Sequence, residues 1–313
     1  MFARLTLTNQ KNAMKKMIFC TALSLLLMGC QSLPMDASDS SANIKGNEQD
    51  SKHPSSSEPF ASTYTIPNSS AYVIRNANVL DGTGQQLDQT DVLFRDGKIA
   101  EIGQKLLVDD LVLSIDGTGM WVTPGIIDVH SHMGVYPSLG ISSLSDGNEA
   151  VAPSTAGVWA EHSIWPQDPN FEKAVAGGVT TAQILPGSAN LFGGRGVTVK
   201  LVPTITMMGM KFPGAPHALK MACGENPKRV YGELGGPQTR MGNMAGYRTK
   251  WIAATAYKKS WEEYEKAKKS GDNSIVAPVR DLEMDTLAGV LNGDIRIHNH
   301  CYRADEMANM IEL

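Results

Sequence analysis

The chain reads WVTPGIIDVHSH over residues 121–132, and this stretch decides the fold and the chemistry expected of it. Ile126–His130 is a nearly continuous apolar run, typical of a strand that is buried on both faces of a parallel sheet. His130 and His132 stand two residues apart at the end of this strand, so its alternation points both imidazoles to the same side. Two imidazoles on a rigid backbone suit Zn²⁺ or a similar divalent ion. A pair of hydrogen-bonded structural histidines is the alternative.

The segment before this stretch, residues 71–121, has the pattern of a small β unit. Tyr72–Leu80 has the composition of a strand. Asp91–Arg95 and Lys98–Ile102 flank the dipeptide Asp-Gly, which is the strongest short-range signal of a β-hairpin.

Helical and strand patterns alternate in the rest of the chain. The expected elements are a helix at Phe171–Ala176, a strand at Val179–Leu185, an amphipathic helix at Thr249–Lys269, a strand at Asp294–His300 and a helix at Ala304–Leu313. Such alternation after a β unit predicts an α/β barrel rather than a sandwich, and the active site of a barrel lies where its strands end.

The first 30 residues differ in kind from the body of the chain. Lys15 and Lys16 precede an apolar run, Met17–Met28, that is too short to span a bilayer and is typical of a signal peptide. The run ends in LMGC, which resembles the lipobox of bacterial lipoproteins and predicts a lipid on Cys30. A plain secretory signal is the alternative.

Residues 31–70 are rich in Ser, Asp, Asn and Pro and contain few large apolar residues, so we expect a disordered tether. A lipid anchor needs such a spacer to hold a folded domain away from the membrane. In lipoproteins of this type, Gln31 after the lipidated cysteine indicates the outer membrane, with the protein facing the periplasm. A soluble periplasmic protein is the alternative location.

Composition places the chain among ordinary globular proteins, with 313 residues, 42% hydrophobic residues and a net charge of −4. Lys and Arg total 28 against 32 Asp and Glu, with no long basic run, so no nucleic-acid partner is expected. Cys223 and Cys301 lie in the folded part without a CxxC spacing. Two buried free thiols are therefore favoured over a disulfide.

Residues 122–132, together with the β unit before them, closely resemble the amidohydrolase superfamily. Three later segments resemble its imidazolonepropionase-related branch, namely GVTT at 178–181, LPGSAN at 185–190 and GENPKR at 224–229. The resemblance implies an α/β fold in which residues 122–313 form part of a (β/α)8 TIM-like barrel. It also implies that residues 71–121 form the N-terminal part of a β-sandwich subdomain.

The same resemblance implies one or two divalent metal ions, Zn²⁺ above all, held by His130 and His132 from the first barrel strand. His298-Asn299-His300 repeats the spacing at the end of a later strand. His300 is the favoured third ligand. His298 is a candidate for substrate contact, with a structural role as the alternative.

A metal site of this kind also takes a bridging anion, which the family supplies with a glutamate or a carboxylated lysine. Glu225 is the candidate and Lys220 the alternative. A third possibility is that Glu225 only caps the turn beside it. In the Gly-rich segment 187–196, Asn190 and Arg195 are candidates for binding a substrate carboxylate, with a purely structural loop as the alternative.

The resemblance implies hydrolysis of a C–N bond in an amide, cyclic amide or peptide-like substrate by a metal-bound hydroxide. The aspartate that serves the family as general base lies on the last barrel strand and is expected beyond residue 313. Residues 123–313 are fewer than the roughly 250 that such a barrel takes, so we expect this chain alone to be incomplete and inactive. The rival class is a non-catalytic periplasmic lipoprotein that uses a degenerate hydrolase fold for binding.

Overall fold

The computed structural model describes residues 60–313. The predicted signal peptide, Cys30 and most of the predicted tether lie outside them. Residues 60–70 form no helix or strand, but two of them are bound to the domain, because Ser62 Oγ donates to the Lys211 carbonyl at 2.6 Å and Thr63 N to the Met208 carbonyl at 3.0 Å. Within residues 60–313, none of the helices combines the length and apolar character needed to cross a membrane.

The first sheet is the predicted β unit. It contains β1 (Tyr72–Leu80), β2 (Gln86–Arg95), β3 (Lys98–Gly103), β4 (Leu113–Asp116) and β5 (Trp121–Val122), in the order β3-β2-β1-β4 with β5 also paired to β1. The β2–β3 hairpin is confirmed. Its turn residues Asp96 and Gly97 both have positive φ, at 50° and 69°, as the tightest hairpin turns require.

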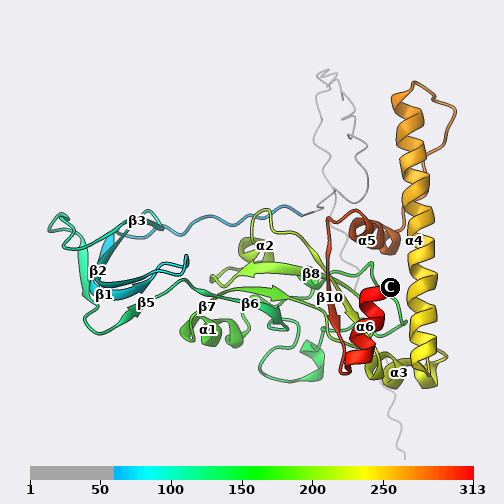
Figure 1. Ribbon diagram of the computed structural model, residues 1–313, viewed down its shortest axis with the longest axis horizontal. Helices are drawn as coiled ribbons and strands as arrows, with labels where there is room; N and C mark the ends of the chain where they lie inside the picture. Colours follow the sequence, from blue (N-terminus) through cyan, green and yellow to red (C-terminus); the bar gives the residue numbers. More distant parts are fainter. Residues whose placement is uncertain (1–59) are drawn as a thin grey trace, which may run out of the picture. The chain divides into compact units, whose positions relative to one another are not determined.

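The second sheet carries the histidine motifs (Figure 1). Its strands are β6 (Ile126–Ser131), β7 (Val179–Ile184), β8 (Phe192–Lys200), β9 (Ala218–Ala222) and β10 (Arg296–His300), in the order β10-β9-β8-β7-β6. β6 runs parallel to β7 and β9 parallel to β10, whereas β8 is antiparallel to both of its neighbours. The architecture is therefore mixed α/β, and a complete eight-stranded barrel is not shown by these strands.

Two sequence expectations about this sheet are wrong. Ile127 and Val129 are each 64% exposed, so β6 is not buried on both faces. The reason is its position, because β6 is an edge strand that pairs only with β7 in the described part of the chain. The segment 187–196 is not wholly a loop, since β8 begins at Phe192. Gly194 lies so close to Val158 that a Cβ would stand 2.5 Å from its carbonyl oxygen, which explains a glycine there.

Helices accompany the second sheet. They are α1 (Pro169–Ala176), α2 (Met207–Met210), α3 (Glu225–Tyr231), α4 (Arg240–Lys269), α5 (Leu282–Leu291) and α6 (Ala304–Glu312). The helices predicted from the sequence correspond to α1, α4 and α6. α4 begins at Arg240 rather than Thr249, with Thr239 Oγ1 accepting from Gly242 N at 3.0 Å. The sequence pattern does not predict these additional turns, because Gly246 is unusual inside a helix. A glycine stands at this position because a Cβ would lie 2.5 Å from the side chain of Leu191.

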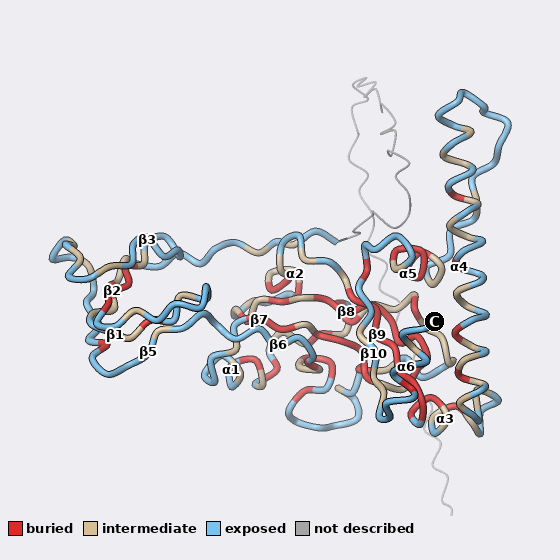
Figure 2. The backbone as a smooth tube through the Cα atoms, viewed as in Figure 1, coloured by how far each residue is buried: buried red, intermediate tan, exposed pale blue. Residues whose placement is uncertain are grey.

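The buried core follows the middle strands β7, β8 and β9 (Figure 2). One cluster includes Phe171 of α1, Ile184 of β7 and Val199 of β8. A second includes Leu219 of β9, Tyr247 of α4 and Leu287 of α5. Each cluster joins helices to the sheet, so the strand ends that carry polar residues are held on a rigid support.

We expect Leu219→Ala to lower the free energy of unfolding by about 2–5 kcal/mol, because Leu219 is fully buried in the second cluster and its loss leaves a cavity. Leu107→Ala is the matched control, since Leu107 is 99% exposed and its loss should cost less than about 0.5 kcal/mol. Urea unfolding followed by circular dichroism measures both. Equal effects of the two substitutions would contradict this assignment of the core.

Candidate metal centre

Side chains from β6 and β9 meet, although β7 and β8 lie between them in the sheet. Nζ of Lys220 lies 3.2 Å from Nε2 of His130. Strands three positions apart in a flat sheet are separated by roughly 14 Å, so the sheet must be curled to bring these two residues together on its concave face. The ends of the strands thus enclose a site.

His132 is oriented by a carbonyl group. Its Nδ1 lies 2.8 Å from the oxygen of Leu185. A carbonyl oxygen only accepts hydrogen bonds, so Nδ1 carries the proton and Nε2 keeps its lone pair for another partner. The rings of His130 and His132 lie edge to face with centroids 5.2 Å apart. This distance is consistent with the prediction that both side chains point to the same side of the strand.

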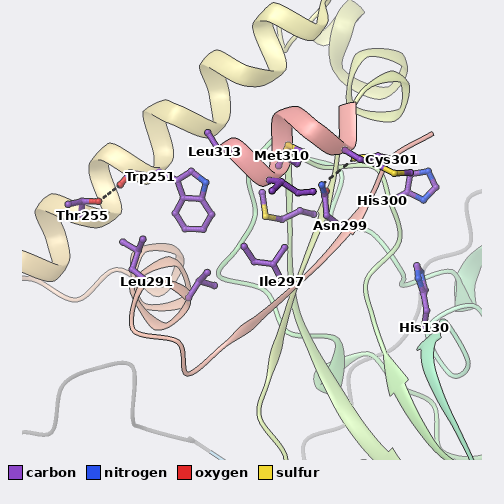
Figure 3. Close-up of a pocket in the computed structure, with 14 residues that line it drawn as sticks. His130, Trp251, Thr255, Leu291, Ile297, Asn299, His300, Cys301, Met310 and Leu313 are labelled. Carbon is purple, nitrogen blue, oxygen red and sulfur yellow. Dashed lines mark hydrogen bonds between the residues drawn. The ribbon is translucent and has the colours of Figure 1, made fainter. Parts of the chain in front are cut away.

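The β10 histidines join the same group of residues. His298 is the register partner of Lys220 across the parallel ladder, and His300 stands two residues further along. Nε2 of His300 is buried and has no hydrogen-bond partner. His130 and His300 also line one cavity of about 840 Å³, and Figure 3 shows both rings at the same end of it.

The electrostatic environment keeps these histidines neutral. Burial, and then the nearby Lys220, lower the pKa of His130, His298 and His300, and burial lowers the pKa of His132. Lys220 is fully buried, and burial lowers its own pKa to about 8. Neutral imidazoles are the form that binds a metal.

Within residues 60–313, no three His, Cys, Asp or Glu side chains stand close enough together to form a ligand set in this structure. Lys220 belongs to this cluster of residues, but a lysine is not one of these four ligand types. The unpartnered Nε2 of His300, the orientation of His132 and the lowered histidine pKa values nevertheless fit a divalent cation as the missing partner.

The structure does not bring Glu225 to this group. Glu225 opens α3, its side chain is 61% exposed, and its Oε1 lies 3.9 Å from Nε of Arg229 one turn later. A residue in the first turn of that helix lies beyond the end of β9, whereas Lys220 lies within the strand. Of the two bridging candidates, the geometry therefore favours Lys220.

Asn190 and Arg195 are held by protein groups. Nδ2 of Asn190 donates to the carbonyls of Glu149 and Ala152. Arg195 is 5% exposed, donates from Nε to Thr286 Oγ1 at 2.8 Å and lies 4.2 Å over the ring of Trp159. Gly194 is the register partner of Lys220, so the next residue points to the opposite face of the sheet. These contacts favour the structural interpretation, and a role in substrate binding stays a prediction.

Arg195→Met is accordingly expected to lower the free energy of unfolding by about 1–3 kcal/mol, because the buried hydrogen bond from Arg195 Nε to Thr286 Oγ1 is lost and Thr286 keeps only its bond to the Leu282 carbonyl among the described residues. The KM for substrate should stay within about twofold of the parent value. Thermal unfolding and steady-state kinetics test the two parts. A large rise in KM without a loss of stability would instead support the predicted substrate contact.

Cys223 and Cys301 form a disulfide bond, with their Cα atoms 5.1 Å apart, so the expectation of two free thiols is wrong. The two residues directly follow β9 and β10, and the in-register pairing of Ala222 with His300 brings them together. The register of the two strands was not readable from the sequence.

Tyr136 was not singled out from the sequence. Its ring lies 5.9 Å from that of His132, and its hydroxyl accepts a hydrogen bond from Asn148. Burial raises the pKa of Tyr136, which keeps the hydroxyl protonated at neutral pH. No spacing or composition signal marks a tyrosine in this loop.

The fold and the site thus define an α/β protein with a histidine and lysine cluster at the ends of its strands. No family model matches the chain. Amidohydrolase tasK of Hapsidospora irregularis is 32% identical over 237 residues, which are 71% of this chain and 24% of that protein. A dihydroorotase of Ruminiclostridium cellulolyticum is 47% identical over 64 residues, which are 20% of this chain and 14% of that protein.

Among solved structures, an amidohydrolase from Thermotoga maritima MSB8 is similar with a TM-score of 0.68 and 37% identity, covering 77% of this chain and 61% of that one. The names of the relatives and this structural neighbour support the amidohydrolase superfamily for the chain. The chain spans about a quarter of the length of the curated tasK protein and about three fifths of the solved structure.

Proposed function

We propose that this protein is a metal-dependent hydrolase of carbon–nitrogen bonds, with its metal held by His130, His132, His300 and Lys220. The observation that carries the proposal is the contact of 3.2 Å between Lys220 Nζ and His130 Nε2 inside a group of four neutral histidines. Zn²⁺ suits such nitrogen ligands, as one ion or as a pair bridged by an anion. When bound, the metal would polarise the substrate carbonyl and activate water for attack.

Lys220 has the chemistry of a bridging group. With its pKa lowered to about 8, about one molecule in ten carries a free amine at pH 7. A free amine adds to carbon dioxide and releases one proton, which converts the lysine into a carbamate with two oxygen donors. This supports the carboxylated lysine over Glu225, whose carboxylate lies at the protein surface.

The remaining residues position the ligands and the substrate. The carbonyl of Leu185 holds the ring of His132 through Nδ1. His298 is the register partner of Lys220, which supports its proposed contact with the substrate. Relatives named dihydroorotase and N-acetylglucosamine-6-phosphate deacetylase support a small-molecule substrate with a carbon–nitrogen bond to be cleaved. The imidazolonepropionase-related branch and a general-base aspartate beyond residue 313 belong to the same proposal.

The proposal includes closure of the second sheet into an eight-stranded barrel. Ile127 and Val129 on the edge strand β6, and Ile297 on the edge strand β10, are exposed and lie where further strands would pair.

The test of function is hydrolysis of a panel of cyclic amides, acylated amino acids and dipeptides by the full-length protein, including the region beyond residue 313 in which the general base is expected. We expect turnover that a chelator abolishes and Zn²⁺ restores. Turnover that is unaffected by complete removal of metal would contradict the proposal. A protein that binds metal but cleaves none of the panel would favour the binding module instead.

We further propose that the protein is a lipoprotein facing the periplasm, anchored through Cys30 after cleavage of residues 1–29. The support is the sequence alone, namely Lys15 and Lys16, the short apolar run and the LMGC motif at 27–30. Cys30→Ser should move the protein from the membrane fraction to the soluble fraction on cell fractionation. Mass spectrometry of the N-terminal peptide of the parent protein detects the lipid on Cys30. Unchanged membrane association of the Cys30→Ser variant would contradict this proposal.

A further inference from the structure

The Cys223–Cys301 disulfide joins the two strands that bring Lys220 and His300 to the site. It lies one residue beyond the last pair of the β9–β10 ladder, Ala222 with His300. At the same point, Cys223 N donates to the His300 carbonyl at 2.8 Å. A covalent bond and a backbone hydrogen bond thus fix the end of β10 directly beside a proposed ligand.

β10 depends on this disulfide and hydrogen bond because β9 is its only strand partner in the described part of the chain. Its residues Ile297 and Asn299 are exposed, so few side-chain contacts hold the strand from the outer side. The end of an edge strand frays easily when it is held only by a few backbone hydrogen bonds. Opening the disulfide would therefore let His300 move relative to Lys220.

The turn after Cys301 has its own support, so loss of the disulfide need not unfold the domain. Glu306 accepts from Tyr302 N and Arg303 N at 3.2 Å each, and its Oε1 lies 2.6 Å from Nε of Arg240. These contacts hold α6 to α4 whether or not the sulfurs are joined. The effect of reduction is then local, at the end of β10.

The bond is also within reach of a small reductant. Cys301 lines the cavity of about 840 Å³ together with His300 (Figure 3). Cys223, in contrast, is buried. A thiolate that enters this cavity can attack Sγ of Cys301 and release Cys223 as the leaving group.

We propose that Cys223 and Cys301 are positioning residues, and that reduction of their disulfide weakens divalent-metal binding at the site. This rests on the proposed function, since it needs a metal on His300. In the reaction a dithiol supplies two electrons and two protons. The S–S bond breaks, two S–H groups form, and the dithiol becomes a disulfide. The site would thus hold metal firmly under oxidising conditions and release it under reducing ones.

The experiment compares Zn²⁺ affinity in the oxidised full chain, in the chain reduced with a dithiol that is then removed without air, and in the double variant Cys223→Ser, Cys301→Ser. Competition with a coloured chelator measures the Kd. We expect the reduced chain and the variant to bind roughly tenfold to a hundredfold more weakly, as when a ligand loses its orienting partner. Reoxidation should restore the affinity of the reduced chain but not of the variant.

Val199→Ala is the matched control, because it removes buried volume from β8 without touching β9 or β10. It should lower the melting temperature and leave the Kd unchanged. Equal Zn²⁺ affinity in the oxidised and reduced chains overturns this inference and leaves the proposed function standing. Alkylation of both cysteines without prior reduction also overturns it. Absence of Zn²⁺ binding in every form removes the proposed function and this inference with it.

Discussion

Replacing Lys220 with alanine is expected to lower kcat by at least about a hundredfold and to remove most of the bound metal, whereas Glu225→Ala should change neither by more than about twofold. Lys220 is fully buried against His130, whereas Glu225 is exposed and pairs with Arg229. Metal analysis and kinetics on the two variants decide between the two bridging candidates.

A second variant separates chemistry from packing at this position. Lys220→Met keeps most of the side-chain volume and removes the amine, so it should fold like the parent and be as inactive as Lys220→Ala. Full metal content in Lys220→Met, or a loss of activity in Glu225→Ala instead, would reverse the assignment.

The second large effect is expected at His130. His130→Ala should weaken Zn²⁺ binding by more than about a hundredfold, because it removes a ligand rather than a group that only orients one. The unfolding temperature of the metal-free protein should change little, since His130 belongs to neither hydrophobic core cluster and lies on a strand that pairs only with β7 in the described part of the chain. Metal titration monitored by calorimetry gives the affinity.

His162→Ala is the control for this prediction. His162 is also a histidine, with a side chain that is 54% exposed, and its ring stacks on that of Trp159. It should bind Zn²⁺ as the parent does. Stoichiometric zinc and full activity in His130→Ala would show that the ligand set is wrong.

Much of the fold could be predicted because local patterns decide it. The β2–β3 hairpin follows from one Asp-Gly dipeptide, and α1 and β7 follow from their periodicity and the glycines between them. β8 could not be predicted, because its glycines are usual in loops. Close neighbours explain two of them, since a Cβ on Gly194 would meet Val158 and a Cβ on Gly196 would meet Leu185. The exposure of β6 could not be predicted either, since its apolar run says nothing about how many strands flank it.

The site was predictable only in part. The spacing of His130 with His132 and of His298 with His300 is local, so the sequence identifies both pairs. The choice between Lys220 and Glu225 depends on curvature of the sheet, which brings β9 to β6 and is not encoded in any short segment. The disulfide depends likewise on strand register. Contacts between distant segments are what the sequence pattern alone does not supply.

We infer that these histidines hold a catalytic metal, and the most direct test is X-ray absorption at the zinc edge on the protein purified without chelator. We expect bound zinc with imidazole and oxygen ligands, and a loss of imidazole scattering in His130→Ala. A zinc environment made only of sulfur, or a parent spectrum that His130→Ala leaves unchanged, would contradict it.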